Sequence, residues 1–180
     1  MQMIANDSCL LIVDVQERLI SVVHSPRSVL VGCATLIQAA NLIGIPIVVS
    51  EQYVRGLGQT VMDLRALAPP DSFREKTAFG CAADASIMAR LGGFGRRQVI
   101  TAGIETHVCV LQSALGLREK GFEVFVVAEA CSSRRPESER AALARMGICG
   151  VHVVTTEMVL FEWLGSKEHL AFKAVQQLVK

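Results

Sequence analysis

Five short apolar segments recur along the chain and predict buried β-strands. They are rich in Val, Ile and Leu and are bounded by Gly, Pro or charged residues. The expected strands span residues 9–13, 46–50, 98–103, 123–128 and 151–156, with a shorter sixth strand around 72–75. Apolar runs of this kind are typical of strands that are covered by helices on both faces.

Helical spacing of apolar residues fills the intervals between several of these strands. The segment 27–44 has apolar residues three and four positions apart and ends on Gly44 before Pro46, which are helix stop signals. The segment 106–121 follows the same spacing, and 136–147 begins with Pro and ends on Gly. Strands that alternate with helices need crossover connections. The expected fold class is therefore α/β: a doubly wound, Rossmann-like, mostly parallel sheet of five or six strands with helices on both faces.

Nothing along the 180 residues marks a domain boundary, because there is no repeat, low-complexity tract or linker. We therefore expect residues 1–180 to form a single domain. The segment 51–97 is less regular than the rest and predicts two weak helices among several turn signals. Long irregular connections at strand ends often carry functional sites.

Composition narrows the classes of partner. The chain has 18 Lys and Arg against 17 Asp and Glu, so no global charge favours nucleic acid or an anionic membrane. Its apolar runs are shorter than the roughly 18 residues of a membrane span, and its N-terminal stretch lacks the features of a secretory signal. The six cysteines form no CxxC pair and no His lies at metal-ligand spacing. We expect a cytoplasmic protein whose partner is a small molecule or another protein, and we expect no cofactor.

Polar residues follow several of the predicted strands, at the edge of an open α/β sheet where ligands bind. Asp14 follows the first strand and Gln52 follows the second. Glu105 and Cys109 follow the strand 98–103, and Lys76 comes just after the short sixth strand. These side chains are the candidates for chemistry.

Position alone leaves two interpretations of each candidate. Cys109 lies in the first turn of a predicted helix, where free N–H groups favour a thiolate, but buried cysteines are often inert. Asp14 is either a general base or the N-cap of the next helix. Lys76 by itself is typical of a solvated surface. His107 lies two residues from Cys109, and such side chains point apart on a helix, so we expect it to line a pocket or to be exposed.

Three motifs together resemble the isochorismatase-like cysteine hydrolase family. They are "LLIVDVQ" with Asp14 and Gln16, "KTAFG" starting at Lys76, and "GIETHVCV" at 103–110. The resemblance covers nearly the whole chain. The stretches "SEQYVRGLGQT" and "ACSSR" resemble the isochorismatase-domain-containing branch more than the nicotinamidases.

The resemblance implies a catalytic triad and an oxyanion hole. Cys109 would be the nucleophile, Asp14 the general base, and Lys76 the group that keeps Asp14 ionised. The family also carries a cis peptide bond, which here falls between Ile104 and Glu105. The backbone N–H groups of Glu105 and Cys109 would then bind the oxyanion.

The resemblance further implies the reaction, which is cleavage of the C–N bond of a small amide through a thioester acyl-enzyme. Family nicotinamidases bind a metal through His residues after the second strand, but "EQYVRGLGQT" has no His, so we expect a metal-independent enzyme. The resemblance also leads us to expect a homo-oligomer. The expected substrate pocket comprises Gln16, Gln52, Tyr53, Leu57, Ile104 and His107, with residues from a neighbouring subunit. Two alternatives remain open: vinyl ether hydrolysis, and a non-catalytic scaffold for thiol sensing or interaction.

Overall fold

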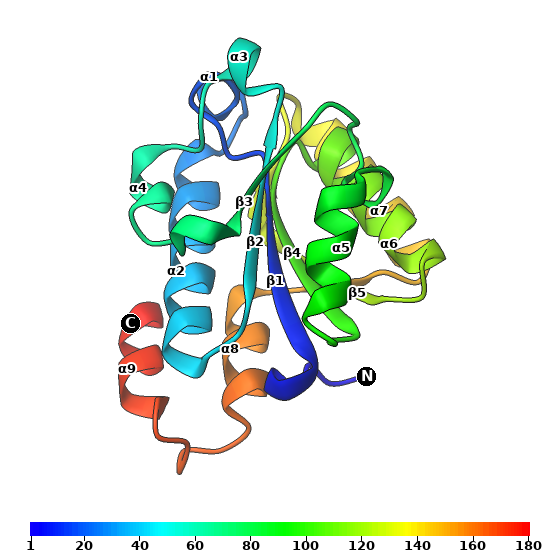
Figure 1. Ribbon diagram of the computed structural model, residues 1–180. Coiled ribbons are helices and arrows are strands. Elements are labelled where there is room, and N and C mark those ends of the chain that lie inside the picture. Colours follow the sequence, from blue (N-terminus) through cyan, green and yellow to red (C-terminus); the bar gives the residue numbers. More distant parts are fainter.

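The computed structural model describes residues 1–180 and contains one six-stranded sheet with helices on both faces (Figure 1). All neighbouring strands are parallel, in the order β3-β2-β1-β4-β5-β6. The strands are β1 Ser8–Val13, β2 Ile47–Gln52, β3 Phe73–Lys76, β4 Gln98–Ile104, β5 Glu123–Ser132 and β6 His152–Val154. The expected doubly wound α/β fold is confirmed, including the sixth strand.

Two hydrophobic cores lie on the two faces of this sheet, and alternate residues of β1 supply both. Leu10 and Ile12 belong to one core, whereas Leu11 and Val13 belong to the other. The first core is covered by α2 Pro26–Ile43, α8 Thr156–Leu164 and α9 Phe172–Gln176. The second core is covered by α5 Ala85–Gly93, α6 Leu111–Glu119 and α7 Pro136–Ile148 (Figure 1). The near-continuous apolar strands thus reflect burial on both faces.

Three short helices follow strand ends. The helix α1 Glu17–Ile20 comes after β1, and the irregular segment after β2 forms α3 Val54–Leu57 and α4 Met62–Arg65. Figure 1 shows α1 and α3 together at the end of the sheet where β1 and β2 finish. The carboxyl edge of the sheet therefore carries the least regular part of the chain.

Strand boundaries differ from the prediction mainly at β5 and β6. The pairing of β5 with β4 shifts register between Thr101 and Gly103, and β5 then continues to Ser132 opposite Ile104. The predicted strand 151–156 is too long, because the Thr155 side chain accepts a hydrogen bond from the Met158 N–H and begins α8.

The longest helix, α2, has the length and hydropathy of a membrane span. Helices that are buried in a protein core can have the same length and hydropathy, and here eight residues of α2 are buried. The helix begins with Pro26 in its first turn and ends at Gly44 with a left-handed φ of 83°, as the stop signals predict.

The strand order reverses between β1 and β4, where Gly103 lies opposite Val13. Gly103 has a φ of +128°, and a Cβ at this position would lie 2.1 Å from the Val13 carbonyl oxygen. Only glycine allows this approach of the two backbones. The close approach therefore fixes the relative position of the segments that follow β1 and β4.

Candidate active site

Asp14 lies directly after β1 with a φ of 51° and is fully buried. Its Oδ1 accepts a hydrogen bond from the Ser50 hydroxyl at 2.6 Å, and its Oδ2 accepts one from the Lys76 ammonium at 2.7 Å. The helix α1 begins three residues later without any side-chain cap. The N-cap interpretation of Asp14 is therefore wrong, because its carboxylate turns into the protein.

Lys76 is the last residue of β3, and its side chain has no exposed surface. Besides Asp14, its ammonium donates to the Gln52 side-chain oxygen at 2.6 Å and to the carbonyls of Ala78 and Phe79 at 3.1 and 3.0 Å. A buried ammonium requires such partners, since burial disfavours the charge. The surface interpretation of Lys76 is therefore wrong.

Cys109 lies in a π-helical turn, Thr106–Val110, between β4 and α6, and is 6% exposed. Burial raises the pKa of its thiol, and the Asp14 carboxylate raises it further, by its charge and as an acceptor for the thiol proton. The Lys76 ammonium lowers the pKa but does not prevail. The position of Cys109 at a predicted helix N-terminus had favoured a thiolate, and this expectation is wrong. At neutral pH the thiol holds its proton beside the carboxylate.

Glu105 connects β4 to this turn, and its peptide bond to Ile104 is cis, as the resemblance implied. The Glu105 carbonyl accepts from the Val108 and Val110 N–H groups at 3.1 and 3.2 Å, whereas its own N–H has no acceptor in the chain. Its carboxylate accepts from Arg134 Nε at 2.9 Å and from the Arg134 N–H at 3.2 Å. The free amide thus lies directly before the turn that carries the thiol.

Two residues expected to line the pocket are structural instead. Gln16 is fully buried, and its amide exchanges hydrogen bonds with the Gln52 backbone at 2.6 and 3.0 Å and donates to the Gly58 carbonyl at 2.6 Å. The Ile104 side chain is fully buried in the core on the α2 face. Neither side chain has a surface that a ligand could contact.

The other expected pocket residues have separate roles. Gln52 holds Lys76 through its oxygen, while its NH₂ donates to the Thr77 carbonyl at 2.7 Å, so it positions the ammonium. Tyr53 is 51% exposed with a φ of 39°, and Leu57 is partly buried in α3. Both lie at the carboxyl edge of the sheet. His107 contacts the Ser133 hydroxyl through Nδ1 at 2.9 Å and lines a polar hollow with Arg134.

Three residues that the sequence analysis did not single out also belong to the site. Ser50 interrupts an apolar strand, and that polar interruption was an available signal. Cys81 is buried close enough to Asp14 and Lys76 for their charges to affect the pKa of its thiol, which burial raises. Arg134 follows β5 at the same edge as the other candidates, so its place after a strand was the usable signal.

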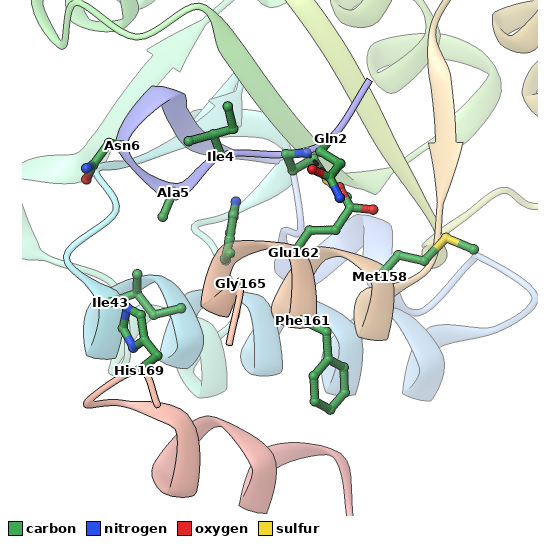
Figure 2. A pocket seen from close by; sticks show the side chains of 12 residues that line it. Gln2, Ile4, Ala5, Asn6, Ile43, Met158, Phe161, Glu162, Gly165 and His169 are labelled. Carbon is green, nitrogen blue, oxygen red and sulfur yellow. Dashed lines mark hydrogen bonds between the residues drawn. The ribbon is translucent and has the colours of Figure 1, made fainter. Parts of the chain in front are cut away.

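The largest of the five principal hollows, about 560 Å³, is not at this site. It lies at the amino ends of the strands, and Figure 2 shows Gln2, Ile4 and Glu162 among its lining side chains. None of the five principal hollows is lined by Asp14, Lys76 or Cys109. Within one chain the three residues are therefore covered. No group of three or more His, Cys, Asp or Glu side chains is arranged to hold a metal ion.

Comparison with known proteins places this geometry in context. The isochorismatase domain profile matches residues 8–158. Isochorismatase domain-containing protein 1 of Salmo salar is 38% identical over 93% of the chain, and the chain spans 59% of that protein's length. Isochorismatase domain-containing protein 2 of Bos taurus is 36% identical over 99% of the chain and 86% of its own length.

Solved structures share the fold along the whole chain. The MAR1 ribonuclease from Caenorhabditis elegans is 33% identical with a TM-score of 0.94, over 99% of this chain and 92% of its own. YcaC from Pseudomonas aeruginosa, solved with covalent acrylamide, is 26% identical with a TM-score of 0.88, over 99% and 95%. The YcaC product of Escherichia coli, described as an octameric hydrolase of unknown specificity, is 24% identical with a TM-score of 0.89 over the same shares and shows the fold alone.

Proposed function

The chain belongs to the isochorismatase family, a hydrolase family, and we propose that it is a metal-independent cysteine hydrolase that cleaves a small amide. The observation that carries this proposal is the buried pair of Asp14 and Lys76, whose charges both act on the Cys109 thiol. A carboxylate that pairs with an ammonium beside a protonated thiol is a general base placed against its nucleophile.

In the proposed first half-reaction, Asp14 takes the thiol proton as the Cys109 sulfur attacks the amide carbonyl carbon. The carbonyl oxygen becomes an oxyanion, and the free N–H of Glu105 supports its stabilisation together with the Cys109 N–H. Asp14 then gives the proton to the leaving nitrogen. The C–N bond breaks, an amine departs, and a thioester remains on Cys109.

In the second half-reaction a water molecule attacks the thioester. Asp14 takes a proton from the water, the C–S bond breaks, and the proton returns to the thiolate as the acid leaves. In both steps the Lys76 ammonium lies 2.7 Å from the Asp14 carboxylate and donates a hydrogen bond to it. Gln52 and two carbonyl oxygens hold the ammonium in place.

We propose that the working protein is a homo-oligomer. The related E. coli protein is octameric, and apolar side chains are exposed near the carboxyl edge of the sheet in this chain, among them Tyr53, Met62 and Phe79. A second copy that packs there would bury this surface and form the wall of the substrate pocket. The mass of the particle, measured by light scattering, tests this arrangement.

Mass spectrometry of the intact protein after exposure to a panel of small amides tests the reaction. The expected result is an acyl adduct that maps to Cys109, is lost in Cys109→Ala, and disappears after hydroxylamine treatment as a thioester should. Oxidised forms of Cys109 without any acyl adduct would support a thiol-sensing protein instead. Cleavage of RNA by the wild type and by Cys109→Ala alike would indicate the activity named for the C. elegans relative.

A further inference from the structure

A second hollow, of about 440 Å³, lies beside the candidate site and is lined entirely by polar side chains. Its walls are His107, Arg134, Arg135 and Ser138. His107 comes from the π-helical turn that carries Cys109, and Ser138 from the first turn of α7. The hollow therefore lies between the catalytic turn and the segment that follows β5.

The donors that face this hollow are largely free. Arg134 uses Nε for Glu105, so both of its terminal nitrogens remain without a protein partner. Arg135 makes no side-chain hydrogen bond or ion pair, and the Ser138 hydroxyl makes none either. His107 contacts Ser133 through Nδ1, which leaves its Nε2 available. These groups form an array of donors with no ligand from the chain.

No carboxylate lines the hollow, and the acidic residues nearby are accounted for. Glu105 is bound by Arg134, and Glu139 accepts from His24 and from the Ser133 N–H. Glu137 lies in the exposed first turn of α7, outside the lining. The two guanidinium groups therefore give the hollow a positive charge that is only partly offset by Glu105.

Glu105 joins this hollow to the chemistry. Its carboxylate binds the Arg134 guanidinium at 2.9 Å, while its backbone N–H is the free donor assigned to the oxyanion. A ligand whose carbonyl oxygen binds that N–H is thus separated from the Arg134 guanidinium by about the length of the Glu105 side chain. Arginine binds carboxylates through two parallel hydrogen bonds, which fixes orientation as well as charge.

We propose that the substrate is an anionic amide whose carboxylate binds Arg134, with Arg135 and His107 completing the anion site. This inference rests on the proposed amide hydrolysis and names its substrate class: short monoamides of dicarboxylic acids. The carboxylate at Arg134 and the oxyanion at Glu105 hold the two ends of the substrate. The scissile carbon is then oriented toward the Cys109 sulfur.

Binding to the Cys109→Ala variant tests the anion site without turnover. Malonamate, succinamate and glutaramate are titrated calorimetrically, each against its uncharged diamide of nearly equal size. At least one monoamide should bind about tenfold or more tightly than its diamide, the difference expected for charge-assisted hydrogen bonds. Added sodium chloride should weaken monoamide binding only. The inference is overturned if no monoamide binds more tightly than its diamide.

Three variants in the same background assign the effect. Arg134→Gln keeps a donor for Glu105 but removes the charge and the fork, so it should cancel the preference for the monoamide over its diamide. Arg135→Gln should reduce the preference by a smaller factor. Arg140→Gln removes one positive charge from α7 outside the hollow and serves as the matched control. Equal losses in Arg134→Gln and Arg140→Gln would contradict a specific site.

Failure of the proposed anion site can be distinguished from failure of the proposed amide hydrolysis. If the monoamides bind through Arg134 but wild-type protein forms no acyl adduct on Cys109, the anion site stands and amide hydrolysis fails. If neutral amides acylate Cys109 and the monoamides bind no better than their diamides, the reaction stands and the anion site fails.

Discussion

The Lys76 ammonium donates to the Asp14 carboxylate at 2.7 Å, and neither side chain has any exposed surface. Ser50 occupies the other carboxylate oxygen, so the pair is fixed on both sides. Buried ion pairs are costly to desolvate and often add little stability. The charges of Asp14 and Lys76 both affect the pKa of the Cys109 thiol, so we explain the pair by its effect on that thiol rather than by stability.

Removing the charge of Asp14 and removing the charge of Lys76 should shift the pKa of Cys109 in opposite directions. Asp14 raises the pKa of the thiol and Lys76 lowers it, so Asp14→Asn should lower that pKa and Lys76→Met should raise it. Iodoacetamide labelling across pH, followed by peptide mapping, measures both shifts. Asp14→Asn should nevertheless lose turnover, because the thiol has lost its base. Shifts of the same sign in both variants would contradict the arrangement.

Breaking the buried pair should also cost stability. Lys76→Met leaves the Asp14 carboxylate buried without its cation, which should cost about 3–5 kcal/mol in the free energy of unfolding. The double variant with Asp14→Asn should lose less than the sum of the two single losses. Arg97→Met, which breaks the exposed pair with Asp7, is the control and should cost about 1 kcal/mol or less. Urea unfolding of all four variants measures these differences, and strict additivity would show that the two residues do not interact.

Stability should fall in alkaline solution because of the buried cysteines. Burial raises the pKa of Cys9 and of Cys131 to about 12 from the ordinary value of 9.0. Above pH 9 the unfolded chain loses these protons first, so the free energy of unfolding decreases as pH rises from 9 toward 12, by about 1.4 kcal/mol per pH unit for each thiol. Urea unfolding at pH 8 and pH 10 should show a smaller decrease in Cys9→Ala than in the wild type. Cys149→Ala, at an exposed cysteine, should leave the decrease unchanged.

Glycine should be required at the point where the strand order reverses. In Gly103→Ala the new Cβ would lie 2.1 Å from the Val13 carbonyl oxygen, at a backbone φ of +128°. We expect a loss of several kcal/mol or failure to fold, since the two strands would have to separate. Gly92→Ala in α5 meets no atom within 4 Å and has an ordinary helical φ, so it should be neutral or stabilising by up to about 1 kcal/mol. Equal thermal stability of the two variants would contradict this assignment.

Local sequence determined the fold class because periodicity, caps and breakers act within one element. Near-continuous apolar runs marked the strands, and Gly44 before Pro46 marked the end of the longest helix. The resemblance in three motifs selected Asp14, Lys76 and Cys109. Residue patterns alone favoured the wrong interpretation of two of them, since an Asp before a helix and a Lys in an irregular segment are usually a cap and a surface residue.

Only the tertiary structure decided what those residues touch. The burial of Lys76 follows from the pairing of β3 with β2, which places its side chain against Asp14 from a segment 62 residues away. The direction of the Cys109 pKa likewise depends on burial and on a carboxylate from another strand, so the helix terminus alone gave the wrong sign. Gln16 and Ile104 lie inside the protein for the same reason. Sequence patterns set local conformation, whereas charge, burial and access at a site are sums over neighbours that only the folded chain brings together.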